Sequence, residues 1–200
     1  MNTIETIQRR RSIRHFDKDF KIPKEDIDQL IKLAMLSPTS YNIQHWKFVV
    51  VDDIEKKQQL QDAAIGQVQV TEASHLILVT TDIKAWEKDM SDKWKNVPKE
   101  VGDFMSSSAR EFYKEKNQLQ RDEAIRSASF ATQTILLAAT AMGYQTGTMI
   151  GFDFDKAAEI ISLPEHHIIS NFVVVGKGLK EAMPRGGQLP LEKVLITDSF

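Results

Sequence analysis

The 200-residue chain contains no cysteine. Disulfides, thiolate nucleophiles, zinc–thiolate sites and iron–sulfur clusters are therefore excluded. The first residues also lack the apolar stretch of a secretory signal peptide, because the charged residues Asp17, Lys18 and Asp19 come soon after the arginine-rich segment. Together these features favour a protein of the reducing cytoplasm.

The chain has no large excess of charge of either sign, since its formal net charge is −2. Such a chain does not attract nucleic acid as a whole, so we expect no nucleic-acid partner and only a local site for any anion. Hydrophobic residues make up 42% and charged residues 27%, which is typical of globular proteins. We expect a single domain over residues 1–200 with a sizeable core.

Long hydrophobic runs are absent as well. The stretch 127–152 has no charged residue, but it contains seven threonines and glutamines and three glycines. Only 135–142 is densely apolar, whereas a membrane-spanning helix needs about 20 mostly apolar residues. We therefore interpret this stretch as a helix and its following turn within a globular core.

The common nucleotide-binding and hydrolase motifs are missing. There is no Walker A loop, no G-x-G-x-x-G after a strand, no H-E-x-x-H and no G-x-S-x-G. Gly143, Gly147 and Gly151 are spaced by four residues and do not match the dinucleotide fingerprint. None of the five histidines shows metal-ligand spacing, so we expect no metal site.

Hydrophobic periodicity and the positions of proline and glycine predict the elements of the fold. The expected helices cover residues 3–9, 23–37, 54–64, 122–142 and 154–161, and the expected strands cover 46–51, 76–81, 144–150 and 168–175. The charged stretch 83–120 is expected to be an exposed helical flank suited to a mobile lid. Helix 122–142 is apolar on most sides and is expected to be buried. The apolar tail 183–200 has no core of its own, which suits docking on a partner subunit. The pattern predicts an α+β domain with three layers, a mixed sheet and a long central helix.

The segment Arg9–Arg14 is the first candidate site. It places four arginines and Ser12 within six residues, and the planar fork of the guanidinium group suits a phosphate. On its own, however, such a segment is more commonly a solvated charged loop.

Four further segments carry polar groups or glycines suited to a ligand. The loop Ser37–Trp46 presents hydroxyl and amide side chains that suit a polar ring edge or a ribityl chain, although a capped turn explains it equally well. Gly66–Gln69 precedes an expected strand, and its glutamines match the alternating edge of a pyrimidine-like ring, with an exposed polar turn as the more common alternative. Thr148–Phe152 allows a ligand to approach backbone at Gly151, and Pro184–Gly187 is a cationic turn.

Taken together, the five segments resemble the FMN-dependent nitroreductase family. The strongest matches are Arg10-Arg11-Ser12-Ile13-Arg14-x-Phe16 and Ser37-Pro38-Thr39-Ser40-x-Asn42-x-Gln44-x-Trp46, in the family's order and spacing. The resemblance implies a three-layer α-β-α nitroreductase-like fold in a domain-exchanged homodimer. It also implies an NAD(P)H-dependent oxidoreductase that passes hydride through FMN to a small flat acceptor, such as a nitroaromatic or a quinone, by a ping-pong mechanism.

The resemblance further implies the flavin contacts, with no obligatory catalytic acid or base. The phosphate and the pyrimidine edge would be held by Arg10, Arg11, Ser12 and Arg14, with Arg185 as a late phosphate cation. The loop residues Pro38, Thr39, Ser40 and Asn42 would reach the flavin from the other subunit. The ring edge would meet Gln69 or, as second candidate, Gln67, and the reactive side of the ring would lie near the backbone of Met149, Ile150 and Gly151.

Two positions depart from the family pattern. Many members carry a glutamate where this chain has Ile150, which matters little if the contact is made through a backbone N–H. A second late basic residue is absent, because Arg185 is followed by Gly186 and Gly187. We expect Arg9 to compensate for that missing cation.

Two other functions are consistent with the sequence. A flavin-binding protein without turnover, acting as a store or a redox sensor, would share the same site. A helical interaction module would use the Arg9–Arg14 patch to bind acidic partners.

Overall fold

A four-stranded antiparallel sheet forms the centre of the computed structural model, which describes residues 1–200. The strands are β1 (Trp46–Val51), β2 (His75–Asp82), β3 (Gln145–Met149) and β4 (His167–Gly176), and their order in the sheet is β1-β2-β4-β3. Every pair of neighbouring strands is antiparallel, which corrects the expected mixed sheet. The connections from β1 to β2 and from β3 to β4 each join antiparallel neighbours, and the long connection from β2 to β3 joins strands that are not neighbours, so no parallel pair of strands forms. The single parallel pairing is an isolated bridge between Ser12 and Thr146.

Seven α-helices surround the sheet. They are α1 (Thr3–Arg9), α2 (Lys24–Ala34), α3 (Ile54–Ala63), α4 (Gln69–Glu72), α5 (Lys99–Tyr113), α6 (Asn117–Ala141) and α7 (Phe154–Ile160). Short 3-10 turns are η1 (Ser40–Asn42), η2 (Ala85–Glu87), η3 (Ser91–Lys93) and η4 (Leu191–Lys193). The expected helices and strands are all present, with boundaries that differ by a few residues, whereas α4 was not expected.

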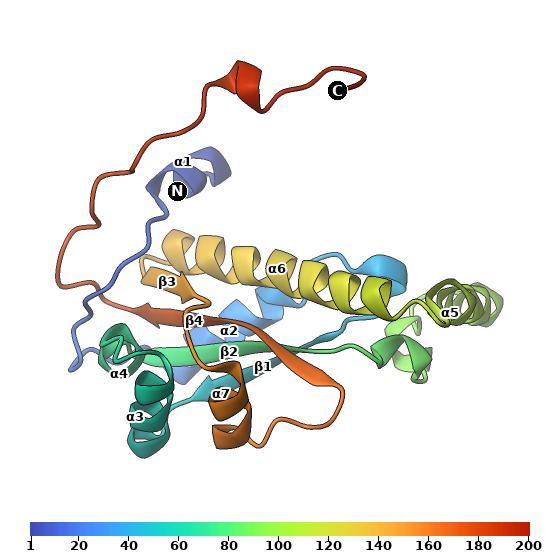
Figure 1. The fold of residues 1–200 in the computed structure, drawn as a ribbon, viewed down its shortest axis with the longest axis horizontal. Coiled ribbons are helices and arrows are strands. Elements are labelled where there is room, and N and C mark those ends of the chain that lie inside the picture. The colour runs from blue at the N-terminus through green and yellow to red at the C-terminus, as the bar shows by residue number, and fades with distance from the viewer.

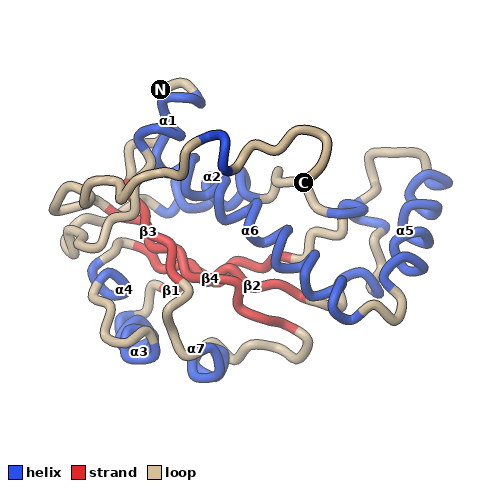
Figure 2. Tube along the Cα trace, turned by 45° about the horizontal axis from the view of Figure 1, so that its top comes forward, coloured by secondary structure: helices blue, strands red, loops and turns tan.

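The three expected layers are present, and they follow from the alternation of side chains along the strands. Figure 2 shows α2 and α6 on one side of the sheet and α3 and α7 on the other. In β2, Leu76 and Leu78 pack in the core beneath α3, α4 and α7, whereas Ile77 and Val79 pack in the core beneath α2 and α6. Successive side chains of a strand point to opposite faces, so β2 serves both cores at once.

Local side chains and one glycine set the helix boundaries. Asp53 and Asp153 cap α3 and α7, since each carboxylate accepts a hydrogen bond from the backbone N–H three residues later. Helix α6 ends at Ala141 and is followed by Gly143, which adopts a φ of +91°, and the Tyr144 N–H then donates to the Ala139 carbonyl at 2.9 Å. This is the Schellman arrangement, which suits glycine because a side chain is strained at positive φ.

Two expectations about the helices need correction. Helix α6 buries one face against the sheet, but its opposite side is partly open and Phe130 is 47% exposed. The flank 83–120 contains helix α5, as expected, but it also has a small core of its own that includes Trp86, Met90 and Tyr113. No helix of the structure is long and apolar enough to cross a membrane.

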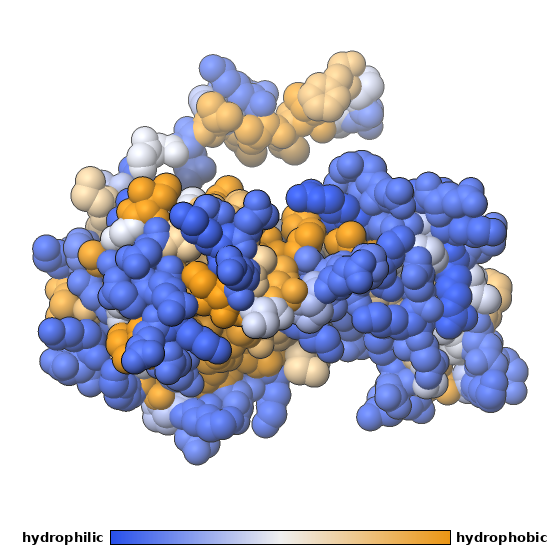
Figure 3. Space-filling model, turned by 60° about the horizontal axis from the view of Figure 1, so that its bottom comes forward, coloured by the Kyte–Doolittle hydropathy of each residue, from blue (hydrophilic) through white to orange (hydrophobic).

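The carboxyl-terminal tail lies apart from the layers. It leaves the end of β4, passes above α1 and carries exposed apolar residues along its length (Figures 1 and 3). Leu189 and Leu191 are each 67% exposed, and Leu195 is 61% exposed. The tail thus contributes almost nothing to the core of its own chain.

Candidate functional site

The arginine-rich segment is anchored along the edge strand β3. The Ile13 N–H donates to the Thr146 carbonyl at 2.9 Å, and the side chains of Ile13 and Phe16 are buried in the core. Gly147 permits this approach, because a Cβ there would lie only 2.8 Å from the Ile13 carbonyl oxygen. With the apolar side chains buried, Ser12 and Arg14 remain exposed at the surface.

A cleft of about 810 Å³ lies between this segment and the start of the tail. All five residues predicted to hold a phosphate line it, namely Arg10, Arg11, Ser12, Arg14 and Arg185. The Arg185 guanidinium donates to the carbonyl oxygens of Gln8 at 3.0 Å and Arg10 at 3.1 Å. Arg11 in turn donates to the Met183 carbonyl. These reciprocal bonds fasten the tail across the basic segment and close one wall of the cleft.

The cleft also contains residues that the sequence analysis missed. His15, Lys180, Glu181, Met183 and Gln188 line it together with Gly186 and Gly187, which belong to the predicted cationic turn. Only the tertiary fold brings them in, since a lysine two residues after a glycine turn carries no signal of its own. The expectation that Arg9 replaces a late cation does not hold, because the Arg9 guanidinium faces Glu5 at 3.4 Å and does not line this cleft. Lys180, by contrast, lines the cleft and adds a positive charge to its wall.

The positive charges in the cleft influence one another. The pKa of Arg10 is lowered from its ordinary value by partial burial and then by the neighbouring cations Arg185 and Arg11. An arginine remains charged even so. The cleft is therefore an electropositive site that favours an anion, and a phosphate group above others because of its matching geometry with guanidinium.

The two predicted glutamines lie next to the end of β3. The Gln67 side-chain amide donates to the Gly151 carbonyl at 3.0 Å, and Gln69 donates to the Gln67 Oε1 at 2.8 Å and to the Met149 sulfur at 3.6 Å. The Gln67 side chain thus uses both its N–H donor and its oxygen acceptor within the protein. The Gln69 Oε1 has no partner in the protein and can accept a hydrogen bond from a ligand. Ile150 is 69% exposed beside them.

The basic segment and the glutamine cluster belong to the same end of the molecule. The Phe16 N–H donates to the Glu72 carboxylate at 3.1 Å, which ties the basic segment to α4, the helix that begins at Gln69. The donor set at this end fits flavin mononucleotide. The cations and Ser12 suit its phosphate, and the Gln69 Oε1 suits the N–H group of its pyrimidine edge.

The loop that carries Pro38, Thr39, Ser40 and Asn42 is rigidly held within its own chain. The Thr39 hydroxyl accepts from the Gln44 N–H at 3.0 Å, the Ser40 hydroxyl accepts from the Tyr113 hydroxyl at 2.7 Å, and the Asn42 amide donates to the Lys93 carbonyl at 2.7 Å. Pro38 is exposed. Tyr41, Asn42 and Gln44 all have positive φ angles, of 49°, 52° and 54°. Such strained backbone persists only where surrounding contacts hold it, and it is common at functional loops.

Within one chain this loop lies at the opposite end of the sheet from the cleft. Trp46, which follows the loop, aligns through β2 with Ile168 of β4, whereas Thr146, beside the cleft, aligns with Val175 of β4. These two positions of β4 are seven residues apart, which corresponds to roughly 20 Å along a strand. Figure 1 likewise shows α4 at one end of the sheet and α5 at the other. The structure therefore brings four of the five predicted segments together and leaves the fifth apart.

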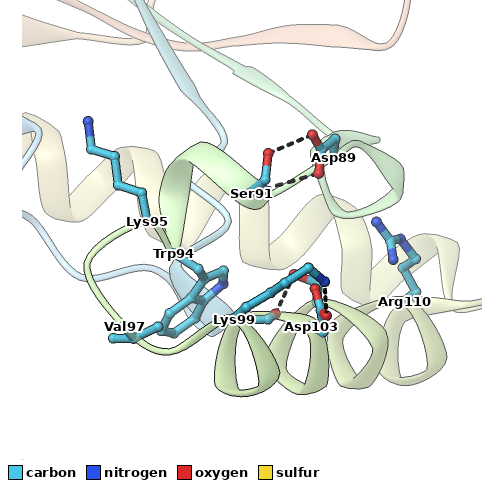
Figure 4. Close-up of a pocket in the computed structure, with 10 residues that line it drawn as sticks. Asp89, Ser91, Trp94, Lys95, Val97, Lys99, Asp103 and Arg110 are labelled. Atoms are coloured by element: carbon cyan, nitrogen blue, oxygen red, sulfur yellow. Dashed lines mark hydrogen bonds and ion pairs between the residues drawn. The ribbon is translucent and has the colours of Figure 1, made fainter.

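A second cavity, of about 520 Å³, lies beside α5 and contains none of the predicted residues. Figure 4 shows that each of its two aspartates is bonded to another residue of the lining. Asp89 accepts two hydrogen bonds from Ser91, and Lys99 pairs with Asp103 one helical turn away. Compared with the cleft at Arg10, this cavity has no concentration of one charge. No group of three or more histidine, aspartate and glutamate side chains could hold a metal ion anywhere in the structure.

Comparison with known proteins gives consistent matches along the chain. The model of the nitroreductase family matches residues 7–177. The protein DrgA from Synechocystis is 42% identical over 98% of this chain and 95% of its own length, and the NAD(P)H nitroreductase MhqN from Bacillus subtilis is 32% identical over 94% of both chains.

Solved structures show the same fold. The nitroreductase YdfN from Bacillus subtilis superimposes with a TM-score of 0.90 at 31% identity, covering 96% of this chain and 97% of its own. A nitroreductase from Exiguobacterium sibiricum, solved in complex with FMN, has a TM-score of 0.89 at 28% identity, covering 98% of this chain and 97% of its own. The motifs, the fold and these matches agree, and the chain belongs to the nitroreductase family.

Proposed function

We propose that this protein binds FMN and reduces a small flat acceptor, such as a nitroaromatic or a quinone, with NAD(P)H by a ping-pong mechanism. The observation that carries the proposal is that two of the segments line one cation-rich cleft, while two others meet at the glutamine amides, and a hydrogen bond from Phe16 to Glu72 ties the two clusters together. The named NAD(P)H nitroreductase relative and the FMN-bound structural neighbour support the same enzyme class. In this proposal residues 1–200 form one FMN-binding domain.

Each group of residues has a distinct role in the proposed site. Arg10, Ser12, Arg14 and Arg185 bind the phosphate of the cofactor, with Arg11 completing the positive wall. The Gln69 Oε1 accepts from the ring edge, and Gln67 holds the Gln69 amide in place. When bound, FMN would supply the chemistry of hydride transfer between the nicotinamide and the acceptor.

Ile150 and Gly151 are exposed, so this side of the proposed site is accessible to a second planar molecule. Arg14 belongs to the basic segment that lines the cleft, and its permanent positive charge would favour negative charge on a ring edge bound there. These residues bind and orient the reactants, so the proposed reaction needs no side chain that transfers a proton.

We further propose that the active form is a homodimer. One chain holds the cleft and the loop with Ser40 and Asn42 at opposite ends of its sheet. A second copy would bring its loop to the cleft of the first. The apolar tail, whose leucines at 189, 191 and 195 are exposed, would cover the partner and lose that exposure.

The test is an anaerobic titration of the protein after loading with FMN and removal of free cofactor. We expect a yellow protein whose visible absorbance bleaches on addition of NADH or NADPH and returns on addition of a quinone. A colourless protein that takes up no FMN would refute the assignment. A yellow protein that does not bleach would instead identify a non-catalytic flavin store or sensor.

A pair of variants tests the site itself. Arg10→Ala removes a cation from the cleft and should weaken FMN binding at least about tenfold, since a charge-assisted hydrogen bond contributes about 1.5–3 kcal/mol. Arg9→Ala is the matched control, because Arg9 is in the same segment but faces Glu5 outside the cleft. An equal loss of FMN affinity in the two variants would show a general effect of positive charge and would contradict a specific contact between Arg10 and the phosphate.

A further inference from the structure

The cleft carries more positive charge than one flavin phosphate requires. Four arginines and Lys180 line it, and Glu181 is the one carboxylate among its lining residues. Five cations and one anion give these side chains a net charge of +4 when His15 is neutral. A phosphate monoester carries a charge of about −2 near neutral pH. Binding a single such group would therefore compensate about half of the local charge.

The geometry keeps this excess charge in place. Arg11 and Arg185 are held by the backbone carbonyls of Met183, Gln8 and Arg10. A carbonyl oxygen accepts a hydrogen bond from a guanidinium N–H but carries no full negative charge, so the guanidinium keeps its positive charge. Lys180 and Glu181 form no ion pair with each other or with any other residue. The Arg11 and Arg185 side chains are thus fixed by the fold, and Lys180 is the one cation of this wall that the proposed flavin contacts leave unused.

We propose that the cleft binds a second phosphate, the 2′-phosphate of NADPH, and that Lys180 selects NADPH over NADH. This inference rests on the proposed function, because it assigns the nucleotide that the FMN-loaded protein uses. The 2′-phosphate concentrates about two negative charges and three acceptor oxygens on one group, whereas each phosphate of the pyrophosphate bridge carries a single charge and occurs in NADH as well. The monoester therefore matches a compact set of cations better.

The cleft is also large enough for both groups. Its volume of about 810 Å³ lies within the range of sites that bury a whole drug-sized ligand, far above the size of a phosphate ion. Lys180 stands on the tail side of the cleft and Arg14 on the side of the basic segment, so the two phosphates can take separate places along the cationic wall.

The experiment uses the FMN-loaded protein and two probes that contain no nicotinamide. Adenosine 2′,5′-bisphosphate carries the additional phosphate and AMP does not, and calorimetry compares their affinities in the wild type and in Lys180→Ala. Lys177→Ala is the control, because Lys177 is three residues away and faces Asp17 at 3.6 Å outside the cleft. Glu181→Gln removes the carboxylate and so makes the cleft more positive, whereas Lys180→Ala makes it less positive.

We expect the bisphosphate to bind about tenfold more tightly than AMP, as one charge-assisted contact predicts. Lys180→Ala should abolish most of this difference and lower kcat/KM for NADPH without changing that for NADH. Lys177→Ala should change neither the ratio of the two probe affinities nor the ratio of kcat/KM for NADPH to that for NADH. Glu181→Gln should raise the preference for the bisphosphate over AMP.

Equal affinity of the wild type for the two probes would overturn the inference, as would an equal effect of Lys180→Ala on NADPH and NADH. Failure of the underlying function has a different signature, since a protein that takes up no FMN or does not bleach with either nucleotide fails before any preference is measured.

Discussion

His45 is the residue whose chemical state depends most on the fold. Its side chain is 2% exposed, it directly follows the loop of Ser40 and Asn42, and its Nδ1 has no hydrogen-bond partner. Burial lowers the pKa of His45 to about 4, against the pull of the nearby Glu123 carboxylate. The folded protein therefore holds a neutral imidazole here at physiological pH.

This pKa predicts how stability depends on pH. Between pH 6.5 and about pH 4 the unfolded chain binds a proton on His45 that the folded chain does not bind. The free energy of unfolding should therefore fall as the pH falls through this window, by about 3 kcal/mol from this group. Urea unfolding at pH 7 and at pH 4 measures the change. His45→Gln should remove most of the difference, and a variant with the full wild-type pH dependence would rule His45 out as its source.

The phosphate cations show the limit of residue-level reasoning. The arginines at 10, 11, 14 and 185 could be named from the sequence because each belongs to a recognisable segment. Lys180 could not, because its place in the cleft depends on the bonds by which Arg185 and Arg11 fasten the tail. Arg9 looked equivalent to its neighbours, but it lies in the last turn of α1, where Glu5 is four residues away.

At the scale of elements, predictions worked where a local physical signal exists. Asp53 and Asp153 cap helices, and β1 is an apolar run broken only by Lys47, so their boundaries were close to the observed ones. Helix α4 was missed because it has four residues and no side-chain cap. Its existence depends on packing, since Gln69 and Val70 are buried under neighbouring elements.

The end of α6 provides a test at this scale. Gly143 has a φ of +91° and nothing within 4 Å of the position of an added Cβ, so Gly143→Ala should cost only the backbone strain. We expect a loss of about 1 kcal/mol in the free energy of unfolding. Thermal or urea unfolding measures it, with Gly186→Ala as the control, because that glycine also has open space but no positive φ. A loss as large in the control would argue against the capping explanation.

At the scale of the whole molecule, the proposed site is divided between the two ends of the sheet. The loop of Ser40 and Asn42 is held by Tyr113 and Lys93 at one end, and the cleft is closed by the tail at the other. An antiparallel sheet is stiff, so no local rearrangement brings these ends together. This distance is the structural argument for a second copy of the chain in the proposed active form.

Removal of the tail tests this assembly. A chain without residues 189–200 keeps Arg185 and the cleft, but it lacks the exposed leucines that would cover a partner. We expect it to be monomeric in light scattering and to bind FMN at least about tenfold more weakly, because the contacts from the second loop are lost. A full-length variant with Leu191→Ser and Leu195→Ser separates apolar contact from tail length. A truncated protein that remains dimeric with full FMN content would contradict this role of the tail.

By itself the sequence determined the helices and strands with strong local signals, the family and most of the candidate residues, because caps, periodicity and short motifs act within a few residues of each other. Only the tertiary structure decided that the sheet is antiparallel, that α6 keeps one side open and that Lys180, not Arg9, joins the cleft. Each of these depends on contacts between distant parts of the chain, such as that of Arg185 with the carbonyl of Gln8. Such contacts leave no mark in the local pattern, since the energy that selects them comes from packing and long-range bonds.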